Sequence, residues 1–339
     1  MPTRAVLWPG WRICLREFEL KNKNGFRVGL LDHGASIRSV LIPGVDGPLN
    51  AVLAYPDPTD YQSDVYFMGS TLGRYAGRIE HGQFTLNQRH YQLAMGDEMH
   101  CLHGGPDGFS SRAWTAEASP DSESLIFRYQ SNDGEQGFPG RLSVSVRYSL
   151  QRDFGLLIEY QASTDADTVI NLSNHAYFNL NSTANEIGNH HFTINADRYA
   201  VLDDHAIPTG ELRDVEGSRF DLRRENSLSE LMNSGNSAGT QGFDHAFELN
   251  RSGPGREFAA SAWSPETGLR LRLFTTQAAL QFYTGEYLGK PMQKRGGFCF
   301  EAQNFPDAPN KRGFPSAVLK PGQVYEQSIL YEFSYDDKP

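Results

Sequence analysis

The stretch LSVSVRYSL, residues 142–150, shows the pattern that decides the fold of this chain. Every second residue is apolar, and serine or arginine stands between. Because successive side chains of a β-strand point to opposite faces, this alternation predicts a strand with one buried face. GLLIEYQAS, residues 155–163, is a second strand candidate.

Strand candidates recur along the whole chain, and turn signals rich in Gly, Pro and Asp separate them. The other candidates are residues 26–34, 36–43, 82–93, 124–130, 170–180, 190–201, 245–250, 258–264, 269–276, 279–288, 297–305 and 327–335. One short helix is expected at 221–232, with Leu222, Leu228 and Leu231 as its buried edge. The sequence therefore predicts an all-β fold with few short helices, as a large antiparallel sandwich or barrel.

No linker, low-complexity tract or internal repeat divides the chain, so we expect one domain over residues 1–339. A two-domain β protein is the alternative, and it would have to divide in a loop such as 181–190.

The composition restricts the partners and the compartment. Acidic residues outnumber basic ones by 41 to 31, and the net charge is -10. With no basic cluster, this argues against nucleic acid or an anionic membrane as partner. Cys14, Cys101 and Cys299 imply no disulfide framework, and no apolar run suits a signal peptide or a membrane span. We therefore expect a cytoplasmic protein.

The candidate strand INLSNHAYFNL, residues 170–180, would have two unlike faces. One face is apolar apart from one Asn, and the other holds Asn171, Ser173, His175, Tyr177 and Asn179. That second face has no permanent charge, which suits contact with a neutral polyol. His175 is its one group that titrates near neutral pH, so we expect a proton-transfer role for it rather than a structural one.

Glu301 lies in the aromatic stretch GFCFEAQNFPD, residues 297–307, on the same expected face as Cys299 and Gln303. No Lys or Arg stands near it in the sequence. Partial desolvation would raise its pKa, as a general base requires. The alternative is an ion pair with an Arg distant in the sequence.

Two more strand candidates carry polar side chains. Asp244, in GFDHAFEL, could orient a sugar hydroxyl, raise the pKa of an imidazole or cap a turn. Gln281 and Tyr283 share a face of LQFYTGEYL, as a polar lining or as ordinary strand exterior.

Glycine-rich segments hold further candidates. Arg74 and Arg78 lie in STLGRYAGRIEHG, where an Arg could bind substrate oxygens or connect loops. His103 precedes two glycines, which would let a substrate approach the backbone closely. The sets His100-Cys101-x-His103 and His190-His191 lack a second ligand group at usual spacing, so we expect no metal.

These stretches together resemble the aldose 1-epimerase (galactose mutarotase) family. The motifs are GSTLGRYAGRI (69–79), LHGGPDGF (102–109), NDGEQGFPG (132–140), NLSNHAYFNL (171–180), FDHAFEL (243–249), TTQAALQFYTG (275–285) and FEAQNFPDAPN (300–310). They occur in the family's order, and the resemblance runs from about residue 34 to residue 335.

The resemblance implies one large β-sandwich with a sugar cleft. It implies an enzyme that interconverts the α and β anomers of free hexoses such as D-galactose and D-glucose, and it implies no cofactor. It implies His175 as general acid and Glu301 as general base. The implied sugar contacts are Arg78, His103, Tyr177, Asp244 and Gln281. The expected partner is a small aldose, and the expected state is a monomer or homodimer.

Two positions depart from the family pattern. Gly77 and Glu286 stand where relatives commonly have Asn. The loss of the amide at position 77 removes a sugar hydrogen bond, so we expect it to affect substrate preference and not the acid–base pair.

The implied chemistry requires one acid and one base, which we expect on opposite sides of the sugar ring. For His175 to be charged near neutrality, its pKa must stay near or above about 6.5, and Asp244 could hold it there. Three other functions remain compatible with the residues. A sugar-phosphate epimerase, the weakest of them, would need a cluster of cations around the site, and only Arg74 and Arg78 lie close together in the sequence. A glycoside hydrolase would use Asp244 and Glu301 as its carboxylate pair, and a sugar-binding module would need no acid–base pair.

Overall fold

The structure is a computed structural model, and it describes residues 15–45, 47–97, 99–120, 122–182, 186–233 and 242–336. Cys14 therefore lies outside the described residues. Within the described ranges, no helix is both long enough and apolar enough to cross a lipid bilayer.

The largest sheet is built from long antiparallel strands. Across the described residues its spatial order is β10 (Thr115–Ala118), β11 (Ser124–Ser131), β12 (Leu142–Gln151), β13 (Gly155–Thr164), β26 (Tyr325–Tyr335), β22 (Leu269–Thr275), β21 (Glu257–Trp263), β16 (His191–Ile194) and β19 (Asn226–Ser227). The alternating stretch at 142–150 lies in β12, an interior strand that pairs with β11 on one side and with β13 on the other. Its apolar residues are buried, as the period of two predicts.

Two further sheets complete the main architecture. One has the order β18 (Pro208–Asp214), β17 (Ala196–Leu202), β20 (Asp244–Leu249), β23 (Ala279–Tyr283) and β24 (Cys299–Gln303). The other has the order β1 (Glu17–Lys21), β2 (Arg27–Leu31), β3 (Ser36–Ile42) and β4 (Leu49–Asn50).

Short pairs and turns fill the connections. The pairs are β5 (Thr71–Leu72) with β15 (Ser173–Asn174), β6 (Arg78–Ile79) with β9 (Cys101–Leu102), β7 (Gln83–Leu86) with β8 (Arg89–Gln92), and β14 (Thr168–Val169) with β25 (Val318–Leu319). The helices are α1 (Leu228–Asn233) and the 3₁₀ turns Pro58–Ser63, Glu80–Gly82, Phe109–Ser111, Glu135–Gly137, Ile187–Asn189 and Ala308–Asn310.

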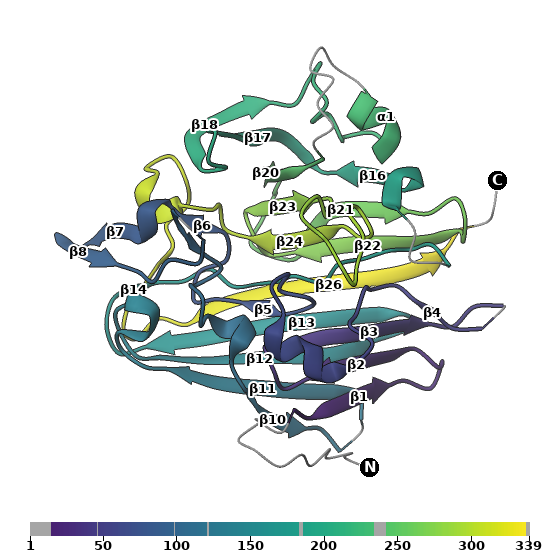
Figure 1. The fold of residues 1–339 in the computed structure, drawn as a ribbon, viewed down its shortest axis with the longest axis horizontal. Coiled ribbons are helices and arrows are strands. Elements are labelled where there is room, and N and C mark those ends of the chain that lie inside the picture. The colour runs from purple at the N-terminus through teal and green to yellow at the C-terminus, as the bar shows by residue number, and fades with distance from the viewer. Residues whose placement is uncertain are drawn as a thin grey trace.

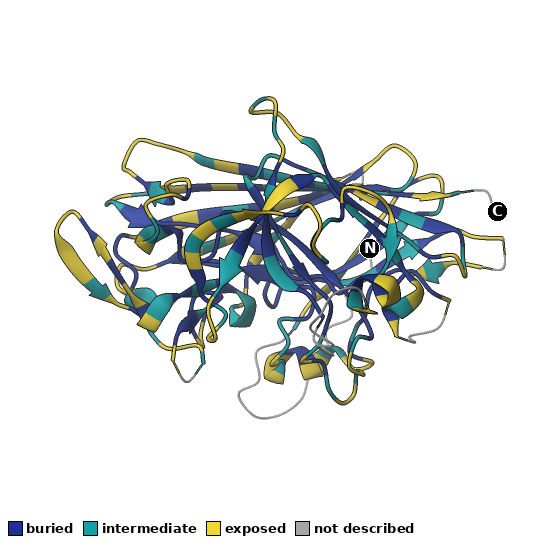
Figure 2. Ribbon diagram, turned by 90° about the horizontal axis from the view of Figure 1, so that it is seen from above, coloured by how far each residue is buried: buried dark blue, intermediate teal, exposed yellow. Residues whose placement is uncertain are grey.

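The two smaller sheets pack against the long-stranded one, and the core lies between them. Figure 1 shows β2 and β3 over β12 and β13, and β23 and β24 over β22 and β26. One cluster of buried apolar side chains joins all three sheets, including Val28, Val146, Phe300 and Tyr331. Hydrogen bonds also cross between the layers, since the Gln327 amide on β26 donates to the Ala302 carbonyl on β24 at 2.7 Å. In Figure 2 the exposed residues lie mainly in the loops and at the edges.

The predicted all-β sandwich is confirmed, but several elements differ, and β1, β10 and β18 were not predicted. Residues 82–93 form a hairpin rather than one strand, because Asn87 and Gln88 both have positive φ and make the tight turn between β7 and β8. Residues 190–201 similarly divide into β16 and β17. The helix predicted at 221–232 is shorter, because Ser227 and Glu230 form a reciprocal capping box that starts α1 at Leu228.

The strand predicted at 170–180 is mostly irregular. Only Ser173–Asn174 forms a strand, and beyond it Phe178 makes isolated bridges to Val52 and Phe298. The asparagine side chains explain this, because their amides donate to backbone carbonyls and replace a regular ladder. The acceptors are Ala76 and Asn304 for Asn171, Gly69 for Asn174, and Gly296 for Asn179.

Candidate active site

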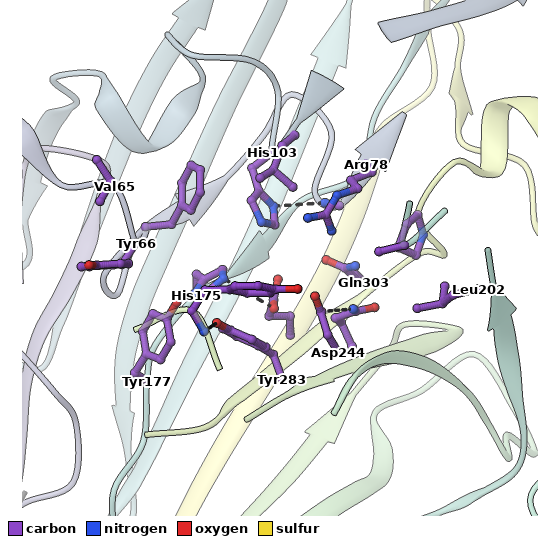
Figure 3. A pocket seen from close by; sticks show the side chains of 18 residues that line it. Val65, Tyr66, Arg78, His103, His175, Tyr177, Leu202, Asp244, Tyr283 and Gln303 are labelled. Atoms are coloured by element: carbon purple, nitrogen blue, oxygen red, sulfur yellow. Dashed lines mark hydrogen bonds and ion pairs between the residues drawn. The ribbon is translucent and has the colours of Figure 1, made fainter. Parts of the chain in front are cut away.

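A cavity of about 260 Å³ lies beside the five-stranded sheet. All seven side chains that the sequence predicts for the site line it: Arg78, His103, His175, Tyr177, Asp244, Gln281 and Glu301. Figure 3 shows Arg78, His103, His175, Tyr177 and Asp244 converging from several elements, with Tyr66 and Val65 at one side and Leu202 at another. The structure therefore brings together residues that are more than 220 positions apart in the sequence.

Three strands of the five-stranded sheet form one polar wall. Gln281 on β23 pairs directly with Glu301 on β24, and Tyr283 pairs with Asp244 on β20, so their side chains share a face. The Gln281 amide donates to Asp244 Oδ1 at 2.6 Å. Asp244 is thus held by a strand neighbour and does not cap a turn.

The short pair β6 and β9 supplies the opposite wall. Arg78 begins β6, and its Nε lies 3.5 Å from Asp97 Oδ2. His103 follows β9, and its Nδ1 accepts a hydrogen bond from the backbone N–H of Gly77 at 3.1 Å. The chain folds tightly here because Gly104 has φ +91°, and a Cβ on it would lie 2.0 Å from the Gly73 carbonyl oxygen.

His175 and Tyr177 reach the cavity from the irregular segment at 170–180. The His175 backbone is held on both sides, by Ser70 at 2.9 Å and by Gly69 at 3.0 Å. Both side chains are nearly fully buried and line the cavity. The expectation that Asn171, Ser173 and Asn179 share their polar face toward a ligand is wrong, because backbone carbonyls take their donors.

His175 and Glu301 form a close buried pair. The Nε2 atom of His175 lies 3.7 Å from Oε1 of Glu301. Burial raises the pKa of the Glu301 carboxyl well above its usual range; the charge of Asp244 adds to the rise, and Arg78 opposes it. Burial also lowers the pKa of His175 to about 4, although a hydrogen bond to its own backbone opposes the change.

The raised pKa predicted for Glu301 is confirmed, but the pKa expected for His175 is wrong. Loss of solvent around the ring outweighs any nearby carboxylate, and Asp244 does not hold the imidazole charged. The two shifts have opposite directions, and together they favour a neutral imidazole beside a protonated carboxyl over an ion pair. The 3.7 Å separation also places the two groups side by side, not on opposite sides of a ring.

Gln303 is a cavity residue that the sequence analysis did not select as a site residue. It follows Glu301 by two positions on β24 and so shares its face, a relation that the strand pattern already indicated. It is fully buried, and both Oε1 and Nε2 lack a hydrogen-bond partner within the described residues. Oε2 of Glu301 and Oε1 of Gln281 are also without partners there. A buried amide in this state indicates a ligand or water position.

The remaining candidates have structural positions. The Arg74 guanidinium donates to the carbonyls of Pro139 and Gly140 at 2.8 Å, so it connects loops and does not line the cavity. Glu286 also lies outside the cavity lining, and its carboxylate pairs with Arg295 at 2.5 Å and Lys294 at 3.0 Å.

One cluster has the composition of a metal site. Ligand atoms of His103, His175 and Glu301 all lie within 4.8 Å of one another. Because Nδ1 of neutral His103 accepts the Gly77 N–H, its proton is on Nε2, which leaves no lone pair for a metal. His190 is similarly committed, since its Nε2 accepts from the Leu180 N–H at 2.9 Å. The hydrogen bonding therefore fits donation to a sugar oxygen better than metal ligation.

The same cavity-forming segments are matched in known proteins. Residues 16–332 match the family model described as aldose 1-epimerase. The chain belongs to the aldose 1-epimerase family. It is 36% identical over 329 residues to the aldose 1-epimerase of Escherichia coli, covering 94% of this chain and 95% of that protein. It is also 36% identical to the galactose mutarotase of Homo sapiens, covering 98% of both chains.

Solved structures agree with the family assignment. An aldose epimerase homologue from C. elegans superposes with a TM-score of 0.89 at 28% identity, covering 95% of this chain and 99% of that one. Galactose 1-epimerase from Lactobacillus acidophilus superposes with a TM-score of 0.86 at 30% identity, covering 98% and 99%. The chain is therefore an isomerase of the aldose 1-epimerase family, which disfavours the hydrolase and the binding-module alternatives.

Proposed function

We propose that this enzyme interconverts the α and β anomers of free hexoses such as D-galactose and D-glucose, with His175 and Glu301 as its acid–base pair and no cofactor. The observation that carries the proposal is the 3.7 Å approach of these two buried groups in a cavity lined by hydrogen-bonding and aromatic side chains. The names of the human and Lactobacillus acidophilus relatives, galactose mutarotase and galactose 1-epimerase, support galactose as a substrate.

The reaction moves one proton in each direction. Glu301 removes the proton of the anomeric hydroxyl, while His175 protonates the ring oxygen, and the bond from C1 to the ring oxygen breaks to give the open aldehyde. Rotation about C1–C2 exposes the other face of the carbonyl. The ring oxygen then attacks C1 and returns its proton to His175, while the aldehyde oxygen takes the proton from Glu301. No covalent intermediate is needed.

The proton that this cycle requires is already present in the pair. In the free cavity the raised pKa of Glu301 and the lowered pKa of His175 favour the carboxyl group as its position. A charged imidazole and a carboxylate hold the same number of protons as the neutral pair, so transfer between the two side chains creates the reactive form. The two reacting oxygens are bonded to the same carbon, which suits an acid and a base that lie side by side.

The other lining groups would bind the sugar hydroxyls. His103 presents an N–H donor and Arg78 a charged donor, while Asp244 accepts. Burial raises the pKa of Asp244, against the opposing effects of Arg78 and the Gln281 hydrogen bond. Tyr177 closes the wall next to His175, with ring centroids 4.8 Å apart.

Polarimetry tests the proposal directly, with freshly dissolved α-D-galactose and α-D-glucose. We expect the wild type to accelerate the approach to equilibrium, and His175→Asn and Glu301→Gln each to lower the rate by about 10²- to 10⁴-fold. His90→Asn and Glu326→Gln change an exposed histidine and an exposed glutamate outside the cavity lining and serve as controls. Full activity in both cavity variants would contradict the assigned pair. A wild type that only follows the buffer would contradict the reaction.

We also propose that residues 1–339 form one domain, as a monomer or homodimer, in the cytoplasm. A single apolar cluster extends from Leu20 to Phe333, which supports one domain. Cys101 and Cys299 are buried free thiols, which is consistent with a reducing compartment.

A further inference from the structure

The strand that carries Glu301 also places a thiol on the other side of the His175 ring. Cys299 lies two residues before Glu301 on β24 and is fully buried. Its Sγ lies 3.4 Å from Nδ1 of His175, while Oε1 of Glu301 lies 3.7 Å from Nε2. One strand therefore contacts both nitrogens of one imidazole.

These two contacts restrict which nitrogen of His175 carries the hydrogen. A neutral imidazole has one N–H donor and one lone-pair acceptor. Proton exchange with Glu301 has to occur at Nε2, the nitrogen that faces the carboxyl group. The hydrogen that His175 keeps throughout the cycle must then be on Nδ1, where it needs an acceptor.

The chemistry of Cys299 suits that role. Burial raises the pKa of its thiol well above the usual range, and the charges of Glu301 and Asp244 add to the rise. The sulfur is therefore an uncharged, weak acceptor. A carboxylate in its place would stabilise imidazolium and retain the proton on His175. A weak acceptor orients the ring and still lets the proton move in both directions.

The other groups around the ring contact it mainly through their faces and edges. The ring centroid of His175 lies 5.4 Å from that of His103, 4.8 Å from that of Tyr177 and 6.2 Å from that of Tyr283. The ring centroid of Phe67 lies 5.9 Å from that of His175. A hydrogen bond between His175 and its own backbone raises the pKa of the ring, so a ring N–H donates there as well. Nδ1 is the ring nitrogen nearer the backbone, so its hydrogen is shared between the backbone and the Cys299 sulfur.

We propose that Cys299 is a positioning residue for proton transfer. Its sulfur accepts the Nδ1–H hydrogen bond of His175 and selects the tautomer whose Nε2 faces Glu301. This inference rests on the proposed function, because it assigns the partner of the group that exchanges the proton.

Variants at position 299 separate a hydrogen-bonding role from a packing role. Cys299→Ala and Cys299→Val remove the acceptor, and Val keeps most of the side-chain volume. Loss of one hydrogen bond predicts that kcat falls about 3- to 10-fold in both variants, with little change in KM. Cys299→Ser restores an acceptor, and we expect its kcat to stay within about 2-fold of wild type. Cys101→Ala, at the other described buried thiol, is the matched control and should leave kcat unchanged.

A purely structural role predicts the reverse order. Serine would then be the worst replacement, because it places a hydroxyl in an apolar site, and valine the best. An activity order in which Val equals wild type and Ser is lowest would overturn the proposal.

Two-bond ¹H–¹⁵N correlation spectra of histidine-labelled protein report the tautomer without any sugar present. We expect the Nδ1–H pattern for His175 in the wild type and in Cys299→Ser, and a mixture of tautomers in Cys299→Ala. The signal is assigned by its absence in His175→Asn. An Nε2–H pattern in the wild type would mean that the thiol donates and would overturn the proposal. If polarimetry shows no catalysis by the wild type, the proposed function fails, whereas these spectra still decide the contact.

Discussion

Gln303→Leu should lower activity and raise stability at the same time. The side chain is fully buried beside Glu301, and neither its oxygen nor its nitrogen has a partner within the described residues. We expect both atoms to bind sugar hydroxyls in the complex. Leucine keeps most of the volume and removes both polar atoms, so the substitution tests the amide alone.

The magnitude follows from the two amide atoms. Each hydrogen bond between uncharged partners contributes about 0.5–1.5 kcal/mol, so losing two lowers kcat/KM by about 5- to 150-fold. In the free enzyme, a buried amide without partners costs about 1–3 kcal/mol, and leucine removes that penalty. Water in the cavity reduces this gain, so the expected increase in the free energy of unfolding is about 1 kcal/mol.

Gln327→Leu is the matched control, because Gln327 is an equally buried amide with both atoms bonded. Its Nε2 donates to the Ala302 carbonyl at 2.7 Å, and its Oε1 accepts from the Tyr325 hydroxyl at 2.6 Å. The same substitution there removes two made hydrogen bonds and leaves the Tyr325 hydroxyl without its acceptor, so it should lower the free energy of unfolding by about 1–3 kcal/mol. Urea unfolding and polarimetry on both variants give the comparison. If Gln303→Leu destabilises the protein as much as Gln327→Leu, the idea that Gln303 awaits a ligand is refuted.

Three other outcomes are expected. The rate should fall on acidification with an apparent pKa near 4, because below that pH His175 is protonated as well as Glu301 and the pair contains no base. Polarimetry corrected for spontaneous mutarotation measures the rate, and a decline near pH 6.5 would contradict this expectation. Asn174→Ala should lower the free energy of unfolding, measured in urea, by about 1–3 kcal/mol, because it leaves the buried Ala176 N–H without its acceptor and removes one of two hydrogen bonds to the Gly69 carbonyl. Gly77 has φ +82°, and a Cβ on it would lie 2.9 Å from Pro306, so Gly77→Asn should destabilise the protein more than Gly134→Asn, where a Cβ would meet no atom within 4 Å. Gly77→Asn should also change the ratio of the galactose rate to the glucose rate. An unchanged ratio would exclude Gly77 as a determinant of substrate preference.

The sequence was sufficient for the fold class because a period of two survives in nearly every long strand. The stretch at 142–150 is the clearest case, and its buried and exposed residues alternate in the structure as the letters do. Element boundaries depended on local chemistry that periodicity does not register. Asn87 and Gln88 divide one apparent strand into a hairpin, and the Ser227–Glu230 capping box shortens the helix.

The site residues could be listed from motifs, but their interactions could not. Motif and parity arguments placed Glu301 in an apolar setting, and its raised pKa agrees. The same arguments failed for His175, because a sequence pattern does not show how completely a ring is desolvated. Gln303 was missed as a site residue for a related reason. Its face was predicted, but the absence of partners for its amide depends on the positions of distant segments.

The segment at 170–180 shows that the same residue types can have opposite uses at adjacent positions. The side chains of Asn171, Asn174 and Asn179 donate to backbone carbonyls and accept from backbone N–H groups, and they hold an irregular segment in one conformation. That conformation delivers His175 to Glu301. The unsatisfied amide of Gln303 lies on a regular strand, where the backbone ladder already supplies the order. Among the residues that the structure describes, the cavity gathers unpartnered atoms of three neighbouring side chains, Gln281, Glu301 and Gln303, and this concentration marks where the sugar is expected to bind.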